Sequence, residues 1–212
     1  MLLIFDLDGT LIDSAPDLAE SVNYTLRTLG KKEVSLENVR SFLGNGAEKL
    51  ITRALSGGSD IWESEEVQKA LRIFKNHYKN NVCNKTFLYE GVKETLEKLP
   101  YKKAIVTNKP YEFVGPILEK LDIKKHFDLW IGGESLKEKK PSPKPLLYVC
   151  ERLGFLPQNA VMIGDSKNDI LAGKNAGIKT VVVTYGYNYG EDVKKYEPDV
   201  VINKFEELLE VL

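Results

Sequence analysis

The sequence predicts an α/β protein: a Rossmann-like, doubly wound parallel sheet as the core, with an inserted all-helical cap. Two observations predict this fold class. From about residue 81 onward, short apolar runs alternate with helical patterns, which is typical of βαβ units and a parallel sheet. Residues 15–80 carry only helical patterns, although the chain opens on an apolar run typical of a strand. We therefore expect residues 1–14 and 81–212 to form one α/β core, and residues 15–80 to form the cap.

The first predicted strand is the apolar run Leu2-Leu3-Ile4-Phe5. Apolar residues without polar alternation are typical of a strand that is buried on both faces of a parallel sheet. The run ends in Asp6-Leu7-Asp8-Gly9-Thr10, at the edge where such sheets bind ligands. Two carboxylates this close repel each other unless a cation or a shared proton separates them. The segment predicts a magnesium site with a nucleophilic carboxylate; an acidic turn after a strand is the alternative.

The predicted cap contains four helical patterns. Apolar spacing predicts helices over residues 15–29, 36–43, 47–55 and 63–79. Gly30 is the expected stop of the first helix, and Ser35 the expected N-cap of the second. Linkers near residues 13–16 and 80–87 would join this unit to the core. A helical unit tethered in this way over a strand-end crevice acts as a lid.

The rest of the chain alternates between the two kinds of element. The expected order is helix 91–99, strand 103–106, helix 111–121, strand 128–131, helix 143–153, strand 161–163, helix 168–176, strand 180–183, strand 200–202 and helix 205–211. Polar residues follow these strands or lie in their connections: Thr107 and Asn108, then Lys140, then Asp165 with Asp169. We expect the sheet to bring all of them to the edge that carries Asp6.

Each of these polar signals also has a purely structural explanation. Thr107 and Asn108 could bind phosphate oxygens, but both residue types are equally common at helix N-caps. Lys140 precedes the stiff Pro141-Ser142-Pro143 segment in a lysine-rich stretch that could be a solvated turn. Asp169 could serve the dipole of its helix, an explanation that fits Asp165 less well.

The composition excludes several classes of protein. The 31 acidic and 30 basic residues leave no basic footprint for nucleic acid or for an anionic membrane, and no apolar stretch is long enough to span a bilayer. The N-terminus lacks the pattern of a secretory signal. Cys83 and Cys150 are too few and too far apart for a disulfide or zinc framework. We expect a cytoplasmic monomer or homodimer with a small-molecule partner, and no nucleic-acid or membrane partner.

Taken in order, the polar segments resemble the motifs of the haloacid dehalogenase-like superfamily of phosphotransferases. The matching segments are Asp6-Leu7-Asp8-Gly9-Thr10, then Thr107, then Lys140, and then Gly164-Asp165-Ser166 with Asp169. The resemblance runs from Met1 to about Gly186. Within the superfamily, residues 106–110, 140–147 and 164–169 are most similar to the phosphoglycolate phosphatases.

This resemblance implies a reaction through an aspartyl-phosphate. Asp6 would attack phosphorus, which divides one difficult displacement into two easier ones. Asp8 would protonate the leaving group and would then deprotonate the hydrolytic water. Thr107 and Lys140 would hold the phosphoryl oxygens in the transition state.

The resemblance also implies a bound Mg²⁺, an ion that prefers oxygen ligands in octahedral geometry. Asp6, the backbone carbonyl of Asp8, and Asp165 would supply the protein ligands. Asp169 would lie next to these ligands without contacting the metal, or would occasionally be a ligand itself.

The cap is expected to choose the substrate. Gly44-Asn45-Gly46 is the candidate loop that reaches into the crevice, and a plain turn between helices is the alternative. Arg40, Lys49, Arg53 and Lys109 are candidates to pair with a substrate carboxylate, such as that of phosphoglycolate.

The sequence disfavours several other activities and leaves some substrates open. Dehalogenase and phosphonate-cleaving relatives lack the second aspartate, which is present here as Asp8. Sugar-phosphate mutases keep all the motifs but usually place a histidine where this chain has Leu18. Pyrophosphate and other small phosphate esters stay open as substrates. A non-enzymatic phosphoacceptor module would be shorter and would lack the cap, and an inactive scaffold is expected to have lost at least one motif.

Overall fold

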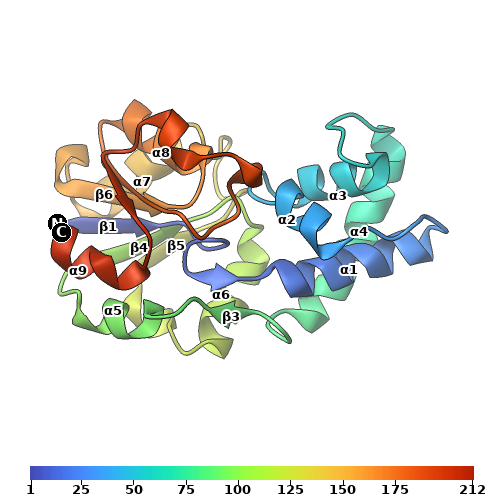
Figure 1. Cartoon of the computed structure of the whole chain (residues 1–212), viewed down its shortest axis with the longest axis horizontal. Coiled ribbons are helices and arrows are strands. Elements are labelled where there is room, and N and C mark those ends of the chain that lie inside the picture. The colour runs from blue at the N-terminus through green and yellow to red at the C-terminus, as the bar shows by residue number, and fades with distance from the viewer.

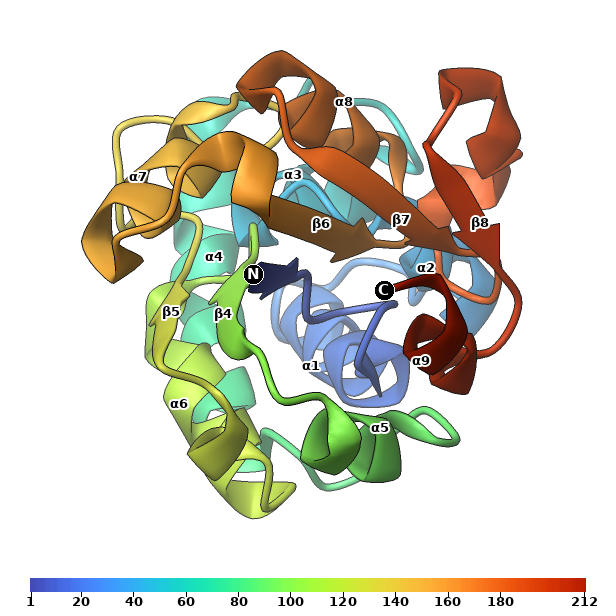
Figure 2. The ribbon, with the colours of Figure 1, turned by 90° about the vertical axis from the view of Figure 1, so that its left-hand side faces the viewer.

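The computed structural model describes all 212 residues and contains one six-stranded parallel sheet. Its strands lie in the order β5-β4-β1-β6-β7-β8 (Figures 1 and 2). Their bounds are β1 Leu2–Phe5, β4 Lys102–Val106, β5 Leu129–Ile131, β6 Ala160–Gly164, β7 Lys179–Val183 and β8 Val200–Ile202. The sheet confirms the predicted fold class, and the helix and strand ends differ from the predicted ones by one or two residues, as is usual for element ends.

The first strand lies in the middle of the sheet. β1 pairs with β4 on one side and with β6 on the other, and all four of its residues are fully buried. Because the chain adds β4 and β5 on one side and β6 to β8 on the other, the direction of strand addition reverses at β1. The crevice beyond the carboxyl end of β1 is therefore the place where a doubly wound sheet binds its ligand.

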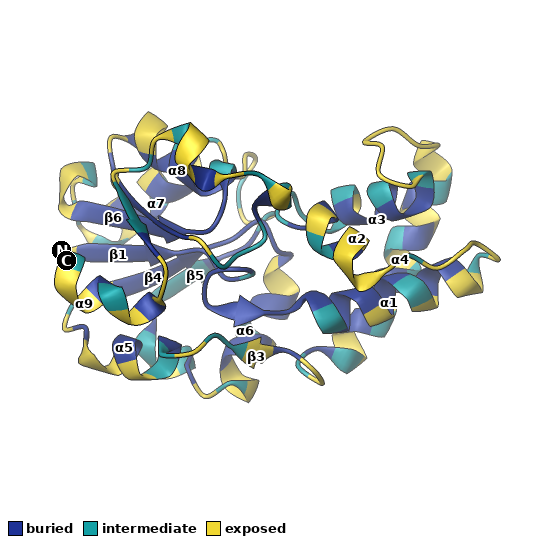
Figure 3. Cartoon of the chain, viewed as in Figure 1, coloured by how far each residue is buried: buried dark blue, intermediate teal, exposed yellow.

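Helices cover both faces of the sheet (Figure 2). Leu3 and Phe5 of β1 belong to a buried apolar cluster with residues of α5, α6 and α9, whereas Leu2 and Ile4 belong to another with residues of α7 and α8. The bounds of these helices are α5 Val92–Lys98, α6 Tyr111–Lys120, α7 Lys144–Leu153, α8 Lys167–Ala176 and α9 Leu208–Val211. Figure 3 shows buried strands between helices whose outer faces are exposed. This arrangement explains why β1 has no polar alternation.

A separate group of helices lies beyond the carboxyl ends of the strands (Figure 1). Its members are α1 Ala15–Thr28, α2 Leu36–Phe42, α3 Ala47–Ser56 and α4 Ser64–Asn81. Ser35 caps α2 by accepting a hydrogen bond from the Asn38 backbone N–H at 3.1 Å. One buried apolar cluster includes residues of these helices and of β1, so the boundary at residues 15 and 80 stays a proposal. None of the protein's helices combines the length and the apolar character that a membrane crossing requires.

The two connections between the cap and the sheet are not simple linkers. β2 (Ile12–Asp13) and β3 (Phe87–Leu88) pair antiparallel with each other. Beside them, the Asp17 carboxylate accepts hydrogen bonds from the backbone N–H groups of Lys85 and Thr86 at 2.8 to 3.0 Å. The cap is therefore attached through a short hydrogen-bonded ribbon. Strands of two residues have no readable periodicity, so the sequence did not predict this ribbon.

Short 3₁₀ helices account for the other differences from the sequence analysis. They are η1 Lys124–His126, η2 Pro157–Asn159, η3 Asn188–Gly190, η4 Val193–Tyr196 and η5 Phe205–Glu207. The predicted helix 205–211 is η5 followed by α9, since its first turn is wound more tightly. η3 and η4 lie between β7 and β8, in a segment for which the sequence analysis predicted no element.

Candidate active site

The polar segments converge on one edge of the sheet. Asp6 follows β1, Thr107 follows β4 and Asp165 follows β6, while Lys140 comes from the loop before α7. Each of these side chains is buried, although each is polar or charged. Buried charges are rare unless they are paired or bind a metal, so this edge is the candidate active site.

The carboxylates nearest the centre form a tight acidic cluster. One oxygen from each of Asp6, Asp165 and Asp169 lies within 4.8 Å of the other two. Burial, only partly offset by the nearby Lys140 ammonium, raises the pKa of Asp6 to about 6. Burial, together with the charges of Asp169 and Asp6, raises the pKa of Asp165 well above its usual value. A divalent cation would offset the repulsion between these buried carboxylates. A set of ligands that consists only of oxygen atoms fits Mg²⁺.

The hydrogen bonds within the cluster indicate which oxygens are free. Asp6 Oδ1 accepts from the Leu7 backbone N–H at 2.7 Å and lies 3.0 Å from Lys140 Nζ, whereas Asp6 Oδ2 has no hydrogen-bond partner. Asp165 accepts from the Tyr187 backbone N–H at 2.7 Å and from the Thr10 hydroxyl at 3.2 Å. Gly9 has a φ of +88°, and a Cβ at this position would lie 2.3 Å from Asp165 Oδ2. Only glycine permits this close approach of the loop after β1.

Asp169 is engaged at both of its oxygens. Its Oδ2 accepts from the backbone N–H groups of Asp165 and Ser166 at 3.2 and 3.0 Å, and from the Ser166 hydroxyl at 2.7 Å. Its Oδ1 accepts from Lys140 Nζ at 2.6 Å. These contacts suit a residue that fixes the loop after β6 and orients Lys140 better than they suit a metal ligand.

Lys140 is shared by two carboxylates. Its Nζ lies 3.0 Å from Asp6 Oδ1 and 2.6 Å from Asp169 Oδ1, and its side chain is 1% exposed. Burial alone would lower the pKa of Lys140, but the charges of Asp169 and Asp6 hold it above its usual value. The residue therefore keeps a positive charge beside the candidate nucleophile.

Asp8 points away from the acidic cluster. Its carboxylate accepts from the Ser14 hydroxyl at 2.5 Å and from Lys109 Nζ at 3.0 and 3.1 Å. The sequence analysis expected Asp8 to bind the metal through its backbone carbonyl. The metal therefore does not need the Asp8 carboxylate. Lys109 was expected only as a partner of the substrate, and its pairing with Asp8 was missed. No local sequence pattern predicts a contact between residues that are 101 positions apart.

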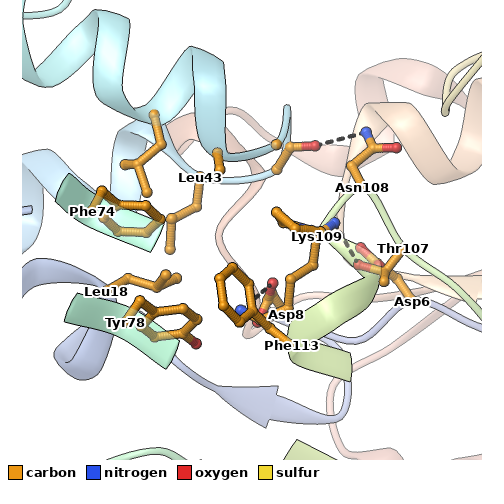
Figure 4. Close-up of a pocket in the computed structure, with 15 residues that line it drawn as sticks. Asp6, Asp8, Leu18, Leu43, Phe74, Tyr78, Thr107, Asn108, Lys109 and Phe113 are labelled. Atoms are coloured by element: carbon orange, nitrogen blue, oxygen red, sulfur yellow. Dashed lines mark hydrogen bonds and ion pairs between the residues drawn. The ribbon is translucent and has the colours of Figure 1, made fainter. Parts of the chain in front are cut away.

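A cavity lies between this edge and the cap (Figure 4). It is lined by Asp6, Asp8, Leu18, Leu43, Gly44, Gly46, Ala47, Leu50, Phe74, Tyr78, Thr107, Asn108, Lys109, Pro110 and Phe113. The space in it that is open to the centre of a water molecule is about 40 Å³, so the cavity is small. We call this the closed form because the Gly44-Asn45-Gly46 loop of the cap is hydrogen-bonded to the core, and a lid of this kind moves to admit a substrate.

Asn108 connects the candidate site with the cap. Its amide nitrogen donates to the backbone oxygens of Gly44 at 2.9 Å and of Lys140 at 3.0 Å. Both N–H donors of the amide are therefore engaged within the protein, while Thr107 next to it lines the cavity and accepts from the Lys109 backbone N–H at 3.2 Å. In this closed form Asn108 holds the surrounding loops together.

The Gly44-Asn45-Gly46 loop lies against three core segments. The Gly44 backbone oxygen accepts from the Asn108 and Asn168 side chains, and the Asn45 backbone oxygen accepts from Lys139 Nζ at 2.8 Å. The Asn45 side chain lies 2.8 Å from Tyr189 Oη and from Asn168 Nδ2. Gly44 has a φ of +101°, and a Cβ there would lie 2.5 Å from Tyr189 Oη. The loop therefore reaches the crevice, as the two glycines predicted.

The cationic residues beside this loop do not reach the cavity. Arg40 pairs with Asp13 at 2.6 Å, Arg53 pairs with Asp60 at 2.7 Å, and Lys49 lies 4.0 Å from Asp60. None of these three cations lines the cavity. Of the four expected partners for a substrate carboxylate, only Lys109 is in position.

The segment between β7 and β8 contributes contacts that the sequence analysis missed. Tyr185 donates to the Thr10 backbone oxygen at 2.8 Å. The Tyr187 hydroxyl donates to Asp13 at 2.8 Å and accepts from the backbone N–H groups of Ser14 and Ala15. The sequence signal was tyrosine at every second position after a strand, in Thr184-Tyr185-Gly186-Tyr187-Asn188-Tyr189.

The chain is similar to several known proteins along most of its length. A family model described as haloacid dehalogenase-like hydrolase matches residues 3–183. The chain is 49% identical over 214 residues to the phosphoglycolate phosphatase of Colwellia psychrerythraea, covering 98% of this chain and 95% of that protein. It is 44% identical to the phosphoglycolate phosphatase of Haemophilus influenzae, covering 100% and 97%. The crystal structure of a predicted phosphoglycolate phosphatase from Haemophilus somnus superimposes with a TM-score of 0.92 at 39% identity, covering 99% and 96%.

Proposed function

The chain belongs to the haloacid dehalogenase-like hydrolase family, and we propose that it is a Mg²⁺-dependent phosphatase that hydrolyses 2-phosphoglycolate to glycolate and phosphate. The membership confirms the resemblance that the motifs carry from one end of the sequence to the other. The names of the relatives support the substrate. The observation that carries the proposed chemistry is the free oxygen of Asp6, next to the cavity and beside a buried lysine.

The first half of the proposed reaction uses Asp6 as the nucleophile. Its Oδ1 is held by Leu7 and Lys140, which leaves Oδ2 to attack phosphorus and to form an aspartyl-phosphate. The bond from phosphorus to the glycolate oxygen breaks, and Asp8 donates a proton to that oxygen. A Mg²⁺ ion held by Asp6, the Asp8 carbonyl and Asp165 would neutralise the charge that builds up on the phosphoryl oxygens.

The second half returns the enzyme to its starting state. Asp8 accepts a proton from a water molecule, whose oxygen attacks phosphorus and releases Asp6 and inorganic phosphate. Asp8 suits this part because Ser14 and Lys109 hold its carboxylate at the cavity, apart from the acidic cluster. Lys140 and the Thr107 hydroxyl would stabilise the phosphoryl oxygens in both halves.

A sugar-phosphate mutase is the weaker alternative. Leu18, at the position where mutase relatives usually have a histidine, lies in the apolar part of the cavity wall. His77 stacks on Tyr24 and contacts Ser21, and it does not line the cavity.

Phosphate release from 2-phosphoglycolate tests this proposal. We expect turnover with Mg²⁺, none with EDTA, and a loss of about 10³-fold or more in kcat for Asp6→Asn, because an amide is a poor nucleophile. Asp122→Asn is the matched control, since Asp122 is exposed and pairs only with surface lysines. Wild-type turnover that survives in Asp6→Asn would refute the nucleophile. Turnover of other esters but not of phosphoglycolate would refute the substrate.

A further inference from the structure

We propose that Lys109 and the Tyr78 hydroxyl form the subsite that binds the carboxylate of the substrate. This inference rests on the proposed function, and it names the feature of the substrate that the cavity selects. The subsite would take small phosphate esters that carry a carboxylate next to the ester carbon.

The charges around the cavity leave one candidate for this task. The charged residues that line it are Asp6, Asp8 and Lys109, so Lys109 is the only cation in its wall. Lys140 does not line the cavity; it is paired with Asp6 and Asp169, and in the proposed function its charge serves the phosphoryl group. A second negative group on the substrate can therefore meet only Lys109.

The surroundings of Lys109 strengthen such a contact. Its side chain is 3% exposed, and its Nζ lies 4.9 Å from the centroid of the Tyr78 ring. Leu18, Phe74 and Phe113 line the same part of the cavity. Figure 4 shows Lys109, Asp8 and Tyr78 together at one end of the cavity, away from Asn108. An ion pair formed among apolar side chains is stronger than the same pair in water.

Lys109 retains the capacity to bind a ligand. An ammonium group has three N–H donors, and the two oxygens of Asp8 engage at most two of them. A substrate carboxylate can thus accept a hydrogen bond from Lys109 while Asp8 stays in place. The substrate carboxylate would then pair with the Lys109 charge inside the closed cavity, and Asp8, the proposed acid and base, would keep its position.

Tyr78 supplies the second observation, since its hydroxyl lies beside the Lys109 ammonium without a regular hydrogen bond to it. Its side chain is fully buried in the wall of the cavity, and its hydroxyl has no hydrogen-bond partner. Buried polar groups without a partner are uncommon and costly, so this one indicates a missing ligand group. Burial raises the pKa of Tyr78 to about 12, so the hydroxyl keeps its proton and can donate to a carboxylate.

The test compares 2-phosphoglycolate with 2-hydroxyethyl phosphate, which is smaller by one oxygen atom and has a neutral alcohol in place of the carboxylate. The readout is the ratio of the two kcat/KM values, because it cancels effects on the shared phosphoryl chemistry. We expect Lys109→Met to lower this ratio by about 100-fold and Tyr78→Phe to lower it by about tenfold. Tyr24→Phe is the control, since Tyr24 is a cap tyrosine that does not line the cavity.

Tyr78→Phe keeps the test valid even if Lys109→Met fails to fold. The substitution removes a hydroxyl without a partner, so the thermal stability of the free protein should stay equal or rise. An unchanged ratio in Tyr78→Phe, and in Lys109→Met if that variant folds, in an enzyme that prefers phosphoglycolate, would overturn the subsite and leave the proposed function intact. A wild-type enzyme that hydrolyses the neutral ester equally well would overturn the subsite and also the proposed substrate.

Discussion

The core wall and the cap wall of the cavity satisfy their polar groups in opposite ways. On the core wall, Lys140 is tied to Asp6 and Asp169 by contacts of 3.0 and 2.6 Å. On the cap wall the side chains are apolar apart from Tyr78, whose hydroxyl has no partner. The lysine and carboxylate charges of the core wall are paired before any ligand binds, although Asn108 Oδ1 has no partner, whereas the one polar side chain of the cap wall, Tyr78, is unpartnered.

This difference indicates where each property of the enzyme resides. A preorganised set of charges suits the phosphoryl chemistry, because such groups need no rearrangement during the reaction. An apolar wall that closes over the ligand suits selection, because binding there depends on size and on a few polar contacts. We therefore expect substitutions on the core wall to act on kcat, and substitutions at the cap contacts to act mainly on KM.

The largest difference between the core wall and the cap contacts should appear when two neighbouring lysines are substituted in turn. Lys140→Met leaves Asp6 and Asp169 without their cation, so we expect kcat to fall by about 10³-fold or more and stability to fall by about 3–5 kcal/mol. Lys139 is exposed and contacts only the cap loop through the Asn45 backbone oxygen. Lys139→Met should therefore leave kcat within about twofold.

Steady-state kinetics and urea unfolding of both variants measure this contrast. Similar losses of kcat in Lys139→Met and Lys140→Met would contradict the expectation that the core wall determines kcat while the cap contacts act mainly on KM. Retained kcat in a folded Lys140→Met protein would contradict the role of Lys140.

The acidic cluster predicts a pH-dependent effect of metal on stability. The pKa of Asp6 is raised to about 6 and that of Asp165 is raised in the same direction, so the folded protein binds these protons more tightly than the unfolded chain does. The stability that this binding contributes is complete below the ordinary aspartate pKa of 3.8 and is lost as the pH rises through about 6. Mg²⁺ competes with the same protons, so its stabilising effect should grow as the pH rises.

Thermal melts with Mg²⁺ and with EDTA, at about pH 5 and about pH 8, test this prediction. At a concentration about 100 times its Kd, Mg²⁺ adds about 2.7 kcal/mol, which raises Tm by about 5–10 °C in a protein of this size. We expect that shift at the higher pH and a smaller one at the lower pH. Equal shifts at both pH values, or a shift that persists in Asp165→Asn, would place the metal elsewhere.

The sequence predicted the core wall well because its signals are local. An apolar run followed by Asp6 and Asp8 specifies both a buried strand and the residues at its carboxyl end. The same argument holds for Thr107 after β4 and Asp165 after β6. A parallel sheet then brings these ends together without any further information.

The contacts of the cap were less predictable because they depend on where distant segments meet. The loop Gly44-Asn45-Gly46 was recognisable as one that could approach the core, but its partners Asn168 and Tyr189 were not. Arg40 and Arg53 were plausible partners of a substrate until the structure paired them with Asp13 and Asp60. Charge and spacing along a helix do not reveal which carboxylate lies opposite.

The smallest predicted effect concerns the contact that keeps the cap closed. Tyr189→Phe removes a hydroxyl that lies 2.8 Å from the Asn45 side chain and accepts from Asn168 at 2.7 Å. A neutral hydrogen bond of this kind contributes about 0.5–1.5 kcal/mol, so the closed form should become about two- to tenfold less favoured. Because substrate is held only in the closed form, we expect KM to rise by that factor while kcat changes little. Tyr196→Phe is the matched control, since its hydroxyl donates to Glu191 and does not touch the cap. Equal KM values in the two variants would mean that the Gly44-Asn45-Gly46 loop docks without help from Tyr189, and that its other core contacts, with Asn108, Lys139 and Asn168, hold it in place.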